Sequence, residues 1–94
     1  MNSNIIRFMT SVELGASECD LLVALAERVK AAETKHPDFS DGIYQGVGVI
    51  GEEYGELCQA LNKGEGEERV MDEAFDLLCV VWRLCRGDWR QEKC

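Results

Sequence analysis

Between residues 43 and 62, apolar side chains recur at alternating steps of four and three, and this spacing restricts what the segment can form. Such steps place side chains on one side of an α-helix, whereas a half-buried strand needs an apolar residue at every second position. The stripe consists of Ile43, Val47, Ile50, Tyr54, Leu57 and Leu61. The segment is therefore predicted to be an amphipathic helix over residues 43–62.

A further helix is predicted on each side of this one. The helix over residues 17–35 begins at Ser17 and Asp20, which have capping-box spacing, and ends before Pro37, because proline cannot continue the hydrogen-bond ladder. After a short glycine-containing break, the third helix is expected over residues 67–86. No segment shows strand alternation, so the predicted fold class is all-α, a short bundle of three main helices.

The sequence predicts a single hydrophobic core. Its 94 residues contain no linker that would divide them, so we expect a single domain over residues 1–94, with residues 1–16 as an N-terminal extension. A domain of this size buries only roughly 60–70% of its unfolded surface. We therefore expect oligomerisation, as a homodimer or homotetramer, to complete the core as a four-helix-type bundle.

Three glycines on one side of the middle helix support this expectation. Gly48, Gly51 and Gly55 each destabilise a helix interior by about 0.5–1 kcal/mol relative to alanine. Close approach of another helix is one reason to place glycine there. An irregular helix start near Gly46 and Gly48 is the alternative.

The formal net charge of −8 argues against two classes of partner. An acidic surface repels nucleic acid and anionic membranes, so neither is expected to bind. No apolar run approaches the roughly 20 residues of a membrane span, and the first residues lack the regions of a signal peptide. The five cysteines include no Cys-x-x-Cys and are expected to be reduced thiols. These features predict a cytoplasmic protein.

Acidic residues border the apolar stripes of the second and third helices. At about 100° per residue, Glu53 falls about 40° beyond one edge of its stripe, with Glu56 one helical step further round. On the third helix, Glu73 and Asp76 repeat this arrangement. Antiparallel pairing of the two helices would bring the four carboxylates together. Their mutual repulsion then requires protons or a cation, and carboxylate-only sites suit Mg²⁺, Mn²⁺ and Ca²⁺. The alternative is that these acids are the solvated flanks of two amphipathic helices.

The same acids resemble a family motif. Glu52-Glu53-Tyr54-Gly55-Glu56, followed by Glu73-Ala74-Phe75-Asp76, resembles the Glu-Glu-x-x-Glu and Glu-x-x-Asp pair of the all-α, MazG-like nucleoside triphosphate pyrophosphohydrolases. The resemblance covers roughly residues 18 to 86. It implies a dimeric or tetrameric enzyme that hydrolyses a (d)NTP to the monophosphate and pyrophosphate, with Mg²⁺ as cofactor or Mn²⁺ as its substitute. It implies as metal ligands Glu53, Glu56, Glu73 and Asp76.

The hydrolysis of a triphosphate also needs catalytic acids and groups that bind phosphate. By the resemblance, Glu52 and Glu53 are the expected catalytic acids that assist the attacking water. Three arginines on or beside the acidic side of the helices are candidate phosphate ligands, with surface salt bridges as the alternative: Arg28, Arg69 and Arg83. The competing function is a non-enzymatic helical module for metal binding or regulatory oligomerisation.

Overall fold

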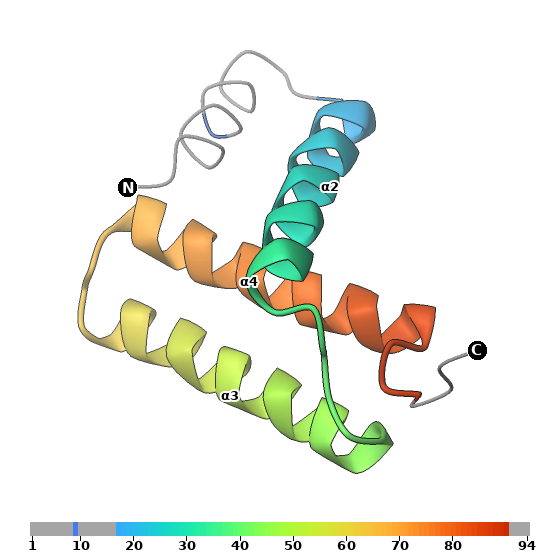
Figure 1. Ribbon diagram of the computed structural model, residues 1–94. Helices are drawn as coiled ribbons and strands as arrows, with labels where there is room; N and C mark the ends of the chain where they lie inside the picture. The colour runs from blue at the N-terminus through green and yellow to red at the C-terminus, as the bar shows by residue number, and fades with distance from the viewer. Residues whose placement is uncertain (1–8, 10–16, 91–94) are drawn as a thin grey trace.

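The structure is a computed structural model that describes Met9 and residues 17–90. Three helices follow one another along this part of the chain (Figure 1): α2 (Glu18–Lys35), α3 (Ile43–Asn62) and α4 (Glu67–Arg86). No strand occurs among the described residues. The three predicted helices and the all-α class are therefore confirmed. All of the predicted N-terminal extension except Met9 lies outside this description.

The ends of the helices follow the predicted signals. At the start of α2, the Asp20 amide donates to the Ser17 hydroxyl at 3.4 Å, and the Ser17 amide donates to Asp20 Oδ2 at 2.8 Å, which completes a capping box. α2 stops at His36, directly before the proline. α4 ends at Gly87, whose φ of 88° is the left-handed conformation that glycine adopts without strain.

α4 is the helix against which the other two pack. It pairs with α3 in antiparallel orientation and contacts α2 on another side, whereas α2 and α3 do not contact each other (Figure 1). The contact with α2 buries Phe75 against Ala24, and Cys79 against Leu25 and Val29. None of the described helices is both long and apolar enough to cross a membrane.

The surface of α3 that meets α4 differs from the predicted stripe. The buried residues of α3 are Gly46 and Ala60, and a Cβ at Gly46 would lie 2.9 Å from Leu84 Cδ1. Small side chains therefore let α3 approach α4 on the side that carries Glu53. Four residues of the predicted stripe are exposed in the single chain: Ile43, Val47, Tyr54 and Leu61.

The glycine-lined side of α3 is open in this chain. A Cβ added at Gly48, Gly51 or Gly55 would meet no atom of the described residues within 4 Å. The predicted close approach is therefore not made by α2 or α4. The residue approached closely is Gly46, for which an irregular helix start was the predicted alternative, whereas α3 is helical from Ile43.

Candidate metal centre

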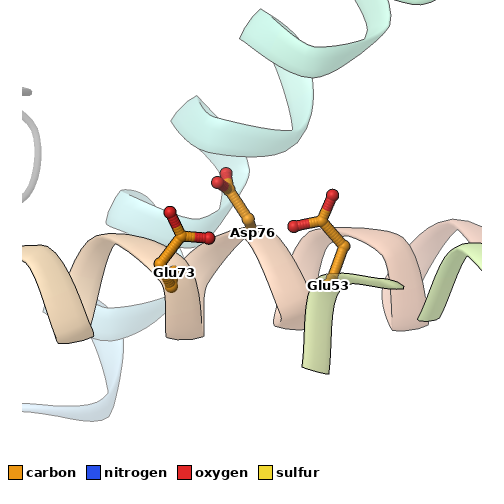
Figure 2. Close-up of side chains that lie close together, drawn as sticks. All are labelled: Glu53, Glu73 and Asp76. Carbon is orange, nitrogen blue, oxygen red and sulfur yellow. The ribbon is translucent and has the colours of Figure 1, made fainter. Parts of the chain in front are cut away.

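Three acidic side chains from two helices converge above α4 (Figure 2). Glu53 comes from α3, while Glu73 and Asp76 come from α4, where a spacing of three residues places them on one side. One carboxylate oxygen of each lies within 4.8 Å of the others. The sequence prediction that the antiparallel pair brings these acids together is confirmed for three of the four residues.

Two of these carboxyl groups have an oxygen without a hydrogen bond. Glu73 is only 3% exposed, and both its Oε2 and the Oε2 of Glu53 are buried with no partner among the described residues. Leaving such a buried acceptor unsatisfied costs about 1–3 kcal/mol. A donor set made only of carboxylate oxygens suits a hard divalent cation. The site therefore fits the cation that the sequence motif implies.

The surroundings of the cluster raise the pKa of two of its carboxyl groups. Burial, with the negative charges of Glu56, Asp76 and Glu73, raises the pKa of Glu53 to about 7. Burial also raises the pKa of Glu73; Arg69 opposes this effect, while Asp76 and Glu56 add to it. The two groups that each have an oxygen without a partner are thus also the two whose pKa is raised by burial and nearby negative charge.

The other two acids of the motif lie at the edge of this cluster. Glu56 is exposed and does not belong to the group within 4.8 Å, yet it is close enough to raise the pKa of Glu53 and of Glu73. Glu52 is exposed and lines a cavity that Glu53 and Asp76 also line. The predicted metal and catalytic roles of these two residues stay predictions.

That cavity has a volume of about 650 Å³ and opens beside the acidic cluster. Its walls come from α2, from the loop that follows α2, from α3 and from α4. Besides the acids they carry Arg28, Lys35 and Phe39. Pockets for small molecules span about 300–1,000 Å³, so a nucleotide-sized ligand has room next to the carboxylates.

Arg28 is buried and joins two acids of α4. Its Nη1 donates to Asp76 Oδ1 at 2.7 Å and to the Asp72 carbonyl at 3.2 Å, while its Nη2 donates to Asp72 Oδ1 at 2.6 Å. The guanidinium also lies over the Phe75 ring, 5.8 Å from its centroid. Sequence reasoning found Arg28 but missed Asp72, whose only signal was its place one turn before Asp76 on α4.

Arg69 pairs with the same acidic surface from within α4. Its Nη2 lies 2.5 Å from Glu73 Oε1, its Nη1 lies 3.6 Å from Asp72 Oδ2, and its Nε lies 3.9 Å from Glu65 Oε2. The Arg69 side chain is 51% exposed. It is therefore far more exposed than the side chain of Arg28, whereas its partner Glu73 is buried.

Arg83 holds the loop that follows α2. Its guanidinium donates to the carbonyls of His36 and Pro37 at 2.8 and 3.1 Å, and to Asp88 Oδ2 at 3.2 Å. The side chain is only 5% exposed. All three arginines thus form ion pairs in the structure, and their predicted contacts with phosphate stay predictions.

Comparison of the chain with protein-family models, with curated proteins and with solved structures gave no match. The resemblance to MazG-like enzymes therefore rests on the acidic motif alone. What the structure adds to that motif is the convergence of Glu53, Glu73 and Asp76 and the contacts around them.

Proposed function

We propose that this chain is a nucleoside triphosphate pyrophosphohydrolase that uses Mg²⁺, or Mn²⁺ in its place, to convert a (d)NTP into the monophosphate and pyrophosphate. The observation that supports this proposal is the convergence of Glu53, Glu73 and Asp76, two of which keep a buried oxygen without a partner among the described residues. Mg²⁺ is usually held by a few carboxylates together with substrate phosphates. Such a cation gives a protein of net charge −8 a means of binding a triphosphate.

The proposal gives each acid a role. Glu53, Glu73 and Asp76 would hold the cation, with Glu56 as the proposed fourth ligand. A bound Mg²⁺ supplies positive charge that offsets the phosphate oxygens and favours ionisation of water. Glu52 lines the cavity without belonging to the cluster, so we assign it the role of the general base that accepts a proton from the attacking water. Glu53 is the second candidate for this role. The water oxygen bonds to the innermost phosphorus, the bridging bond breaks, and pyrophosphate leaves.

The arginines differ in how well their contacts suit a role in phosphate binding. Arg69 is the best suited, because its side chain is half-exposed and its guanidinium has further N–H donors for a phosphate while Nη2 stays on Glu73. Arg28 lines the cavity, so its charge can act on a phosphate there while its bonds to α4 persist. Arg83 is the least suited, since its buried guanidinium already bonds two carbonyls and a carboxylate.

We further propose that a second copy of the chain covers the open side of α3, which would give a homodimer or homotetramer with a four-helix-type core. In the described residues, only six hydrophobic side chains are buried, while ten large ones are exposed. The open side combines Val47, Tyr54 and Leu61 with three glycines that have no neighbour among these residues. Glycine permits close helix approach, and a symmetric pair would bury the same surface on both copies.

The activity is tested by incubating the purified protein with a panel of canonical and modified nucleoside triphosphates and Mg²⁺ or Mn²⁺. The expected products are pyrophosphate and a nucleoside monophosphate from at least one member of the panel. Nucleoside diphosphate with orthophosphate, or no turnover across the panel with either metal, would contradict the proposal.

One observation favours the second candidate, a non-enzymatic module that binds metal or regulates through oligomerisation. Arg28, Arg69 and Arg83 are each bound to carboxylates or carbonyls of the same chain. A module of this kind would bind Mn²⁺ at the carboxylate cluster and would release no pyrophosphate from the panel. The same incubation therefore separates the two functions.

A further inference from the structure

We propose that Asp72 is a positioning residue for the candidate metal centre and that it acts through Arg28 and Arg69. The inference rests on the metal site proposed above. Asp72 lies outside the acidic motif, and it is not one of the three carboxylates within 4.8 Å of one another. Its importance comes from the two arginines that it joins.

Five charged residues of α2 and α4 form a chain of alternating sign. Asp72 lies at its centre, with Oδ1 2.6 Å from Arg28 Nη2 and Oδ2 3.6 Å from Arg69 Nη1. Arg28 continues to Asp76 Oδ1 at 2.7 Å, and Arg69 continues to Glu73 Oε1 at 2.5 Å. Both ends of the chain are therefore proposed metal ligands.

These contacts leave Glu73 with one oxygen bound to Arg69 and one oxygen without a partner among the described residues. Arg69 occupies Oε1, while Oε2 is buried without a partner in the described part of the chain. Arg28 similarly binds Oδ1 of Asp76, and Asp76 still contributes an oxygen to the group of three. Groups that hold metal ligands in this way fix their orientation, and their loss typically weakens metal affinity 10- to 100-fold.

Asp72 also holds the two guanidinium groups away from the second oxygens of Asp76 and Glu73, which they do not bind. The Arg28 side chain is only 8% exposed, and Asp72 provides two of its three hydrogen bonds, one from the carboxylate and one from the carbonyl. Without the Asp72 carboxylate, both guanidinium groups would be free to turn onto the other oxygens of Asp76 and Glu73, where they would compete with a divalent cation. Loss of the Asp72 carboxylate is thus expected to weaken metal binding.

The test measures Mn²⁺ binding by electron paramagnetic resonance, with no nucleotide present, for the parent and three variants. Asp72→Asn removes the charge and Asp72→Glu keeps it on a longer side chain. Glu65→Gln is the matched control, because Glu65 is another acidic partner of Arg69, at 3.9 Å. Circular dichroism and melting in EDTA establish that each variant is folded. We expect Asp72→Asn and Asp72→Glu each to weaken binding about tenfold or more, and Glu65→Gln to leave it within about twofold of the parent, a change typical of a screened surface charge.

Each contrary result has a distinct meaning. Parent-like affinity of Asp72→Asn would overturn the inference while the metal site stands. Weak binding by Asp72→Asn together with parent-like binding by Asp72→Glu would show that only charge at a distance matters, and would also overturn it. Should Asp72→Asn fail to fold, Asp72→Glu alone decides in the same sense. Absence of Mn²⁺ binding by the parent would contradict the proposed metal site itself.

Discussion

Arg69 Nη2 lies 2.5 Å from Oε1 of Glu73, while Oε2 of the same carboxyl group is buried and has no hydrogen-bond partner in the described part of the chain. One oxygen of the Glu73 carboxyl group is therefore paired with a guanidinium, and the other oxygen has no such partner. Burial raises the pKa of Glu73 in spite of Arg69. Ionisation of Glu73 is thus less favourable than in water, and the proposed divalent cation would offset this effect.

Replacing Glu73 separates stability from function. In EDTA, Glu73→Gln should melt no lower than the parent, with any gain on the order of 1 kcal/mol, because a like-charge contact with Glu53 and Asp76 is lost. With Mg²⁺ present, the parent should melt at a higher temperature than the variant. Bound cation adds RT ln(1 + [L]/Kd) to the free energy of unfolding, about 2.7 kcal/mol at a hundredfold excess over Kd, and the variant should gain less.

Melting curves of both proteins, with EDTA and with Mg²⁺, measure this reversal. Equal stabilisation of the two proteins by Mg²⁺ with a nucleotide analogue would show that Glu73 is not a ligand. Full pyrophosphohydrolase activity of Glu73→Gln would show the same.

The stability of the metal-free protein should depend on pH through Glu53. Its pKa is raised from 4.5 to about 7 in the folded state, so between these values the folded state binds more protons than the unfolded state. Stability therefore falls as the pH rises from about 4.5 to about 7, and this loss is complete above the folded pKa. Glu53→Gln should flatten the melting temperature over this range in EDTA. An equally steep profile for the variant would assign the dependence to other groups.

Close packing of α3 on α4 should make Gly46 intolerant of a side chain. A Cβ there would lie 2.9 Å from Leu84 Cδ1 and 3.1 Å from atoms of Phe39 and Ser40. Overpacking costs about 1–3 kcal/mol, which exceeds the gain of about 0.5–1 kcal/mol from replacing glycine in a helix. Gly46→Ala should therefore lower the free energy of unfolding measured in urea. In a Leu84→Ala background the same substitution should cost less, and an unchanged cost there would exclude Leu84 as its source.

The open side of α3 predicts which substitution would disrupt the proposed oligomer. Gly51→Arg should give a monomer that keeps its helix content, because arginine is a good helix former and only a second copy would approach this position. Light scattering at micromolar concentration measures the assembly. Leu22→Arg, at an exposed apolar position on α2, is the control and should leave the assembly unchanged. A monodisperse parent monomer would refute the predicted oligomer.

The helices could be predicted from the sequence because their signals are local. Ser17 with Asp20, the His36-Pro37 pair and Gly87 act on the backbone within a few residues, and the structure places the helix ends at these signals. The placement of Glu73 beside Asp76 was also predictable, because a spacing of three residues fixes them on one side of a helix whatever its neighbours are.

Packing between helices could not be predicted in the same way. The most apolar stripe of α3 suggested its core face, but Gly46 and Ala60 pack on α4 instead, because small residues allow the closest approach. Because Glu53 lies on the same side of α3 as Gly46 and Ala60, this packing places Glu53 at the contact between the two helices. Asp72 was missed for a similar reason, since its role depends on Arg28, which lies 44 residues away in the sequence.

The most direct test of the proposed reaction follows the oxygen of the attacking water. Turnover of a nucleoside triphosphate from the panel in ¹⁸O-labelled water with Mg²⁺, analysed by mass spectrometry, shows which phosphorus is attacked. Attack at the innermost phosphorus places ¹⁸O in the nucleoside monophosphate and leaves the pyrophosphate unlabelled, which is the result that we predict. Label in pyrophosphate or in orthophosphate, with an unlabelled nucleotide product, would contradict the assignment of this chain as a pyrophosphohydrolase that attacks the innermost phosphorus.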